Sequence, residues 1–457
     1  MLIRLVSAAV SVSLLTCAGA LAQVSSEELS KSIEGIAARA LAQPNAVGLS
    51  IAVAKGDQVV FAGSFGKADL ETGFAGDKDT LFRIGSVTKQ FTAAAVMKLV
   101  EQGKLSLDDT LAKLLPDFPA TPKPVTLRQL LNHTSGIWSY TSDDKFMGRE
   151  ATLELTPAEL VAIFKDHAPD FDPGTKWNYS NSGYYLLGEI IAKTSGKTYA
   201  QFVQDELLTP QGLARTRYES NREIIPNRAQ GYTYEKGKLF NDKSIGADVP
   251  GAAGSLLSSA EGLVRWNLAL ASGKVVSPKS YEQMSTSATL PDGSETRYGF
   301  GLQLGVWEGR PRVAHGGGIF GFTSQLTYLP KDQLTIAVIS NCDGFNPAKL
   351  ADSIARAALG ISDFVPADLA VSAQEIARFA GEYKFVEFPM EISIFERDGK
   401  MWSQAVGQKE TRLHYQGKGE FRADFDPQVK IVFTEGTGPA DQFVLHQGGE
   451  HPANRKK

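Results

Sequence analysis

Cysteine is almost absent from this 457-residue sequence, which contains only Cys17 and Cys342. Two cysteines cannot build a disulfide framework, so a hydrophobic core has to stabilise the fold. Metal ligands are scarce too, since no Cys/His cluster has ligand spacing and no His-Glu-x-x-His occurs. The six histidines are scattered at His133, His167, His315, His414, His446 and His451. We therefore expect no metal site and no cofactor.

Basic blocks are also missing, because 47 Lys and Arg residues are spread among 51 Asp and Glu residues. Without a basic patch or a basic-aromatic stripe, a nucleic-acid partner is not expected.

Long apolar runs are absent, except for the short run 5–15 that follows Arg4. Small residues at Ala20 and Ala22 then predict a signal peptide over 1–22, with cleavage before Gln23. The protein would be exported to a bacterial periplasm or secreted, with no transmembrane segment after cleavage. A lipid anchor on Cys17 is the alternative, although Thr16 is an unusual residue before a lipidated cysteine.

Strand-like patterns lie at both ends of a mainly helical middle. The runs 47–53 and 58–62 predict an antiparallel hairpin, and period-two runs return from about residue 298. This order predicts an α+β fold, in which an antiparallel sheet flanked by helices carries an inserted helical lobe. We expect a catalytic domain over 23–360, a linker over 361–371 and a small β domain over 372–457, with a frayed tail from residue 448.

Ser86 and Lys89 form a Ser-x-x-Lys pair where an apolar helical run begins. Residues three apart on a helix lie one above the other, so a buried, neutral lysine could activate the serine as a nucleophile. The sequence repeats the spacing twice. Ser64–Lys67 follows a strand-like run, and Ser142–Lys145 lies in a polar stretch that we interpret as a solvated loop.

Tyr179 and Asn181 form the only Tyr-x-Asn in the chain, just before a helical run. The tyrosine could pass protons to and from a leaving group, and the asparagine could orient a lysine and donate to a substrate carbonyl. A helix-capping turn with a packed tyrosine explains the same residues without chemistry.

His315, Gly316 and Gly317 follow a strand-like run and open a glycine-rich loop. Small residues there allow a substrate to approach the backbone, whose N–H groups can stabilise an oxyanion. A plain glycine turn is one alternative. A nucleotide fingerprint over 316–321 is another, but a strand-like run follows it where that motif requires a helix. A second His-x-Gly begins at His446, but it lies near the expected frayed tail and is not predicted to belong to a site.

These three motifs occur in the order found in the serine β-lactamase and penicillin-binding superfamily, and residues 26–360 resemble it. The most similar branch contains class C β-lactamases, D-alanyl-D-alanine carboxypeptidases, D-aminopeptidases and family VIII esterases. Further stretches also resemble it, namely 103–110, 127–136 and 254–261. The last 85 or so residues resemble the small β-barrel domain appended to some members.

The resemblance implies a role for each motif residue. Ser86 would be the nucleophile, Lys89 its base and Tyr179 the proton relay to the leaving group and from the deacylating water. Asn181 would orient Lys89 and the substrate. His315 and Gly317 would orient the substrate. The backbone N–H groups of Ser86 and Gly318 would form the oxyanion hole.

One departure from the family pattern bears on the substrate. Many β-lactam hydrolases carry Lys-Thr-Gly where this chain has His315-Gly316-Gly317, so the charge and hydroxyl that favour a substrate carboxylate are missing. The resemblance therefore implies an exported serine hydrolase that acts through an acyl-enzyme on a small-molecule or short-peptide substrate with a scissile acyl bond. Esters or D-amino-acid peptides and amides are the expected substrates, with β-lactams less favoured. A β-lactamase or D-alanyl-D-alanine carboxypeptidase remains an alternative, as does a non-catalytic penicillin-binding sensor.

Overall fold

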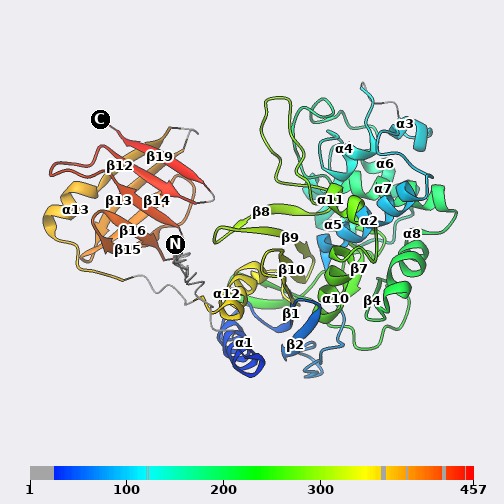
Figure 1. Ribbon diagram of the computed structural model, residues 1–457, viewed down its shortest axis with the longest axis horizontal. Helices are drawn as coiled ribbons and strands as arrows, with labels where there is room; N and C mark the ends of the chain where they lie inside the picture. Colours follow the sequence, from blue (N-terminus) through cyan, green and yellow to red (C-terminus); the bar gives the residue numbers. More distant parts are fainter. Residues whose placement is uncertain are drawn as a thin grey trace, which may run out of the picture. The chain divides into compact units, whose positions relative to one another are not determined.

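The computed structural model describes residues 25–119, 121, 123–361, 367–386, 390–424, 429–447 and 449–456. The chain divides into two compact units, one ending at Ile361 and one beginning after it (Figure 1). The predicted signal peptide, including Cys17, and residues 362–366 of the predicted linker lie outside the described residues. Within these ranges, no helix has both the length and the apolar character needed to cross a bilayer.

A six-stranded antiparallel sheet forms the centre of the first unit, with the strand order β2-β1-β11-β10-β9-β8. The two ends of the unit both contribute to it, as the sequence predicted. The strands are β1 Gly48–Lys55, β2 Gln58–Gly66, β8 Gln303–Trp307, β9 Arg310–Ile319, β10 Phe322–Leu329 and β11 Leu334–Ser340.

Helices cover both faces of this sheet. On β1, Ile51 and Val53 face one hydrophobic cluster, whereas Ala52 between them faces another. The first cluster lies under α1 (Ser26–Leu41) and α12 (Pro347–Leu359), which lie side by side in Figure 1. The second cluster lies under α10 (Ala260–Ala271) and continues into the helical lobe. The central strands are therefore buried on both faces.

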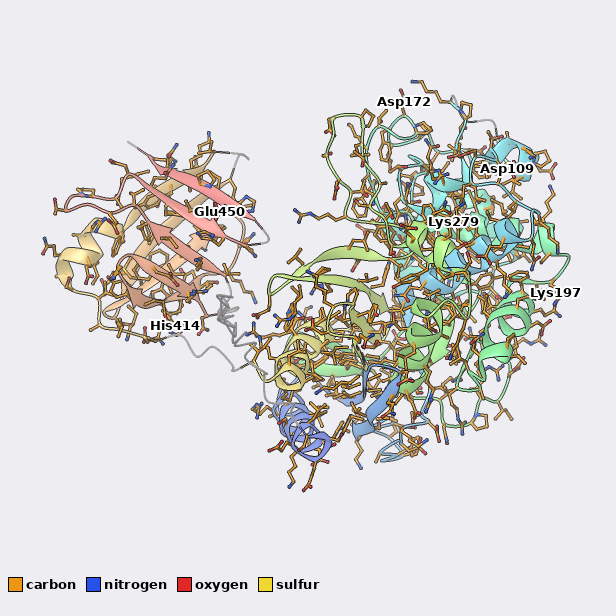
Figure 2. All side chains as sticks on the ribbon, viewed as in Figure 1. Asp109, Asp172, Lys197, Lys279, His414 and Glu450 are labelled. Atoms are coloured by element: carbon orange, nitrogen blue, oxygen red, sulfur yellow. The ribbon has the colours of Figure 1, made fainter. Side chains whose placement is uncertain are left out.

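The helical lobe is inserted between β2 and β8. Its central helix, α2, is buried almost all round, and Phe91 stacks on Trp266 of α10 with ring centroids 3.8 Å apart. At the surface, Lys197 projects from the end of α7 and pairs with Glu206, 2.9 Å from Nζ to Oε1 (Figure 2). The helices are α2 Thr88–Glu101, α3 Leu111–Leu114, α4 Leu127–Leu131, α5 Asp144–Arg149, α6 Pro157–Phe164, α7 Asn181–Ser195, α8 Tyr199–Phe202, α9 Gly251–Gly254 and α11 Pro278–Met284.

Short elements complete the lobe. The 3-10 turns are Gly85–Val87, Tyr140–Ser142, Glu150–Thr152 and Thr209–Gln211, and a π-helical turn spans Val203–Leu208. The short strands are β3 Phe82–Arg83, β4 Thr216–Tyr218, β5 Tyr232–Glu235, β6 Lys238–Asn241 and β7 Leu256–Ser258.

The second unit is a closed eight-stranded antiparallel barrel, which confirms the predicted small β domain. Its strands are β12 Gly381–Phe385, β13 Glu391–Arg397, β14 Lys400–Ala405, β15 Thr411–Gly417, β16 Glu420–Ala423, β17 Lys430–Phe433, β18 Gln442–His446 and β19 Glu450–Arg455. The helix α13 (Ala373–Phe379) starts with a capping box between Ser372 and Glu375 and buries Phe379 in the aromatic interior.

The predicted frayed tail is wrong, because β19 closes the barrel. It pairs with β18 on one side and with β12 on the other, so the last ordered strand satisfies two edges. Figure 2 marks Glu450 at its start and His414 on β15.

Candidate active site

The backbone bends sharply at the start of α2 to present Ser86. Gly85 has φ +49°, and a Cβ on it would lie 3.0 Å from the nitrogen of Gly318 on β9. Only glycine takes up this conformation without strain and allows so close an approach. Ser86 therefore lies in the turn Gly85–Val87 that leads into α2, beside the end of β9.

Lys89 lies one turn further on and is fully buried, with 0% of its surface exposed. Its amine makes three hydrogen-bond contacts. Nζ lies 3.1 Å from Ser86 Oγ, 2.7 Å from Asn181 Oδ1 and 2.9 Å from the carbonyl oxygen of Ala253. The structure therefore brings three of the predicted residues, Ser86, Lys89 and Asn181, into direct contact.

Burial lowers the pKa of Lys89 well below its ordinary value of 10.5. No carboxylate lies within 4.0 Å of its amine among the described residues, so nothing there pairs with a charged form. The three contacts suit a neutral amine. In the neutral form its two hydrogens can go to the oxygens of Asn181 and Ala253, which can only accept, and this leaves the lone pair for the hydroxyl of Ser86.

A small hydroxyl network fixes the amide of Asn181. Its Nδ2 donates to Thr141 Oγ1 at 2.9 Å, and its backbone N–H donates to Ser139 Oγ at 3.1 Å. The two hydroxyls are themselves 2.9 Å apart. This arrangement holds Oδ1 toward Lys89.

The sequence prediction missed both hydroxyls, since Thr141 lies in the polar stretch 140–145, which was interpreted as a solvated loop, and Ser139 directly precedes it. Tyr140 is instead 1% exposed, and its hydroxyl donates to the carbonyl oxygen of Val249 at 2.8 Å. The sequence signal that could have revealed a buried segment is a tyrosine, Tyr140, flanked by the two hydroxyl residues Ser139 and Thr141.

Tyr179 covers the amine from the other side, with the Lys89 nitrogen 4.6 Å from its ring centroid. Its hydroxyl is buried and makes no hydrogen bond to the described residues. Burial raises the pKa of Tyr179, and the nearby Ser86 side chain partly opposes that rise. An unpaired hydroxyl beside the serine is free to bond a leaving group.

A histidine and a second tyrosine back this ring. His133 lies 4.3 Å from Tyr179 between ring centroids, and its Nδ1 accepts from the N–H of Ser180 at 3.1 Å. Burial holds the pKa of His133 well below its usual value. The sequence prediction did not single out Tyr298, whose ring centroid lies 4.7 Å from that of His133.

His315 is buried and neutral. Burial lowers its pKa to about 3. Its Nε2 lies 2.8 Å from the Tyr298 hydroxyl and its Nδ1 2.6 Å from the carbonyl oxygen of Gly316. Both ring nitrogens are therefore occupied, and the ring centroid is 6.3 Å from that of Tyr179. The positive edge that the family position could supply is not present here near neutral pH.

The two glycines after it differ in their surroundings. A Cβ at Gly317 would collide with the carbonyl oxygen of Ile84 and with Ser324 Oγ, which donates to that same oxygen at 2.8 Å. Gly317 thus lets β9 approach the segment before Ser86. A Cβ at Gly318 would meet nothing within 4 Å, so this residue faces open space beside Ser86.

A cavity of about 350 Å³ opens onto Ser86. It is mostly apolar, and its polar groups are those around the serine together with Thr323 and Asp343. The lining residues are Gly85, Ser86, Tyr140, Thr141, Met147, Asn181, Ile245, Pro250, Ala253, Gly254, Gly318, Ile319, Phe320, Phe322, Thr323 and Asp343. Four of the predicted site residues, Lys89, Tyr179, His315 and Gly317, are not among them. Across the described ranges, no group of His, Cys, Asp or Glu is arranged to hold a metal ion.

Comparison with known proteins identifies this arrangement. The family model described as Beta-lactamase matches residues 33–361. The chain belongs to the beta-lactamase family. This confirms the resemblance seen in the sequence, and the protein is a serine hydrolase of the β-lactamase fold.

Several characterised proteins are similar to this beta-lactamase-family chain. Penicillin-binding protein 4* of Bacillus subtilis is 27% identical over 89% of this chain and 95% of its own length. A D-aminopeptidase of Brucella anthropi is 27% identical over 68% of this chain, which spans 59% of that longer protein. The solved structure of an octameric penicillin-binding protein homologue from Pyrococcus abyssi matches 93% of this chain and 99% of its own, with a TM-score of 0.68 and 27% identity.

Proposed function

We propose that this protein cleaves esters or D-amino-acid peptides and amides through an acyl-enzyme on Ser86. The neutral, buried amine of Lys89 carries this proposal, because it lies 3.1 Å from Ser86 Oγ with its other two contacts already made to acceptors. It takes the hydroxyl proton as Oγ attacks the substrate carbonyl carbon. The N–H groups of Ser86 and Gly318 stabilise the oxyanion that forms.

Tyr179 then completes each half of the reaction. Its unpaired hydroxyl gives a proton to the departing alkoxide or amine, and the proton held by Lys89 replaces it. In the second half a water loses its proton to the same relay, attacks the acyl carbon and releases Ser86. Asn181 keeps the amine of Lys89 aligned throughout.

The substrate class is inferred from what the cavity offers. His315 is neutral with both ring nitrogens occupied, and no Lys or Arg is among the described lining residues. A substrate carboxylate, as in β-lactams, would find no cationic partner. The similarity to a D-aminopeptidase supports D-amino-acid peptides and amides as substrates.

The test uses the mature protein with a p-nitrophenyl short-chain ester, a D-alanyl peptide, nitrocefin and a fluorescent penicillin, followed by both turnover and intact mass. We expect Ser86→Ala to reduce turnover of the ester or peptide by at least about 10³-fold. The control is Ser64→Ala, which alters another Ser-x-x-Lys pair and should leave turnover unchanged. Turnover that persists in Ser86→Ala would refute the mechanism, and a lasting mass adduct without turnover would indicate a penicillin-binding sensor.

We also propose export, on the basis of the sequence over 1–22. N-terminal sequencing of the protein recovered from the periplasm should begin at Gln23. A lipid-modified N-terminus at Cys17 would contradict cleavage at that site.

A further inference from the structure

The cavity beside Ser86 carries one charged side chain among its described lining residues, the carboxylate of Asp343. Asp343 follows the end of β11, in the turn beside Thr323, whose hydroxyl donates to the carbonyl oxygens of Cys342 and Phe345 at 3.1 Å each. A strand of the central sheet thus holds this turn against the cavity.

The carboxylate itself is oriented by two donors. Thr233 Oγ1 donates to Asp343 Oδ2 at 2.7 Å, and the N–H of Gly321 donates to the same oxygen at 3.4 Å. Oδ1 accepts no hydrogen bond from the described residues and belongs to a side chain that lines the cavity. One oxygen is therefore fixed by the protein, and the other remains available to a ligand.

The cation beyond the cavity wall is already neutralised. Arg83 lies against Phe322, with its guanidinium carbon 5.9 Å from the ring centroid. It pairs with Glu219 at 2.8 Å and with Asp242 at 3.8 Å, and it does not line the cavity. Asp343 is consequently the uncompensated charge that a substrate meets.

We propose that Asp343 selects substrates carrying an ammonium group and disfavours those with a carboxylate in its place. This inference rests on the proposed hydrolysis at Ser86 and names the substrate class more narrowly. An ammonium donates to Oδ1 in a charge-assisted hydrogen bond, which is stronger than a bond between neutral groups. A carboxylate would meet a like charge in a mostly apolar cavity and is disfavoured.

The experiment compares substrates that differ only by an ammonium in place of a methyl group. D-alanine p-nitroanilide is paired with isobutyryl p-nitroanilide, and 6-aminohexanoyl p-nitroanilide is paired with the heptanoyl compound to sample a longer spacing. At pH 7 in the native protein, we expect kcat/KM for the cation to exceed that for its neutral match by about 10- to 100-fold in at least one pair.

The Asp343→Asn substitution keeps the shape of the side chain and its bonds to Thr233 and Gly321 but removes the charge. We expect it to abolish the cation preference, so that the ratio of kcat/KM between the ammonium and methyl substrates falls to about one. Asp57→Asn, at the exposed turn between β1 and β2, is the matched control and should preserve the preference. Thr233→Val, which releases the carboxylate without removing it, should reduce the preference and serves if the first variant does not fold.

A native ratio near one in both pairs, or a preference that survives Asp343→Asn, would overturn the inference. If no substrate is turned over, the proposed function fails separately. The inference is then tested by NMR titration of D-alaninamide and isobutyramide into Ser86→Ala protein with and without Asp343→Asn. Tighter binding of the ammonium compound that depends on Asp343 supports it, and equal binding refutes it.

Discussion

The buried amine of Lys89 predicts an unusual pH dependence of stability. An unfolded lysine keeps its proton up to its ordinary pKa of 10.5, whereas burial lowers the folded pKa well below that value. Between these two pKa values the unfolded chain binds one more proton than the folded chain at this site. The free energy of unfolding therefore rises with pH by about 1.4 kcal/mol per unit, until the pH reaches 10.5.

The substitution Lys89→Met removes this titration while filling the same space. Two acceptors, Asn181 Oδ1 and the carbonyl oxygen of Ala253, lose their donor at a cost of about 1–3 kcal/mol each that does not vary with pH. We therefore expect the stability difference, native minus variant, to increase with pH by about 1.4 kcal/mol per unit between the folded pKa of Lys89 and pH 10.5. Low pH favours the variant and high pH favours the native protein.

Denaturant unfolding followed by tryptophan fluorescence measures this difference, because four of the five tryptophans lie in the first unit. Lys98→Met is the matched control, since Lys98 lies on the same helix and is partly exposed. Its stability difference should stay flat across the same pH range. A flat difference for Lys89→Met as well would mean that Lys89 keeps its proton in the folded state. The proposed activation of Ser86 would then be refuted.

Three further outcomes are expected. Gly317→Ala forces β9 away from the segment that carries Ser86 and should reduce kcat/KM by at least about tenfold. In Gly318→Ala the added methyl group meets open space, so the melting temperature should be unchanged. A stable, fully active Gly317→Ala protein would contradict this expectation. The value of kcat/KM should fall toward acid pH as Lys89 becomes protonated. His315, whose pKa is about 3, should add no inflection near pH 6.5. An inflection near pH 6.5 in the native protein that disappears in His315→Gln would refute the neutrality of His315. Phe379→Ala leaves a cavity in the aromatic interior of the barrel and should lower the free energy of unfolding of the second unit by about 3–5 kcal/mol. Calorimetry measures this change, and a loss below about 1 kcal/mol would show that the interior repacks.

Periodicity and spacing predicted much of the fold from the sequence. The strands at both ends of the first unit were predicted because buried strands and hairpin turns leave local patterns. The Ser86–Lys89 contact was predictable for the same reason, since a helix fixes the geometry of residues three apart.

Features that depend on distant partners were not predicted. The neutrality of His315 follows from its burial and from Tyr298, which no local pattern announces. Thr141 was assigned to a solvated loop because its hydrogen bond is to Asn181, forty residues away. The strand β19 was expected to fray because its order comes from barrel closure with β12. Tertiary context decided each of these cases.

The pairing of β1 with β11 has a consequence for how the protein forms. Ile51 of β1 lies opposite Val338 of β11. During synthesis, almost the whole first unit must therefore be made before β1 can pair with β11. Pairings of such long sequence separation slow folding, and the apolar edge of the β1–β2 hairpin stays open meanwhile. The nascent chain therefore exposes this strand edge until β11 has been made, and a chain that ended after β10 would leave the edge without its partner.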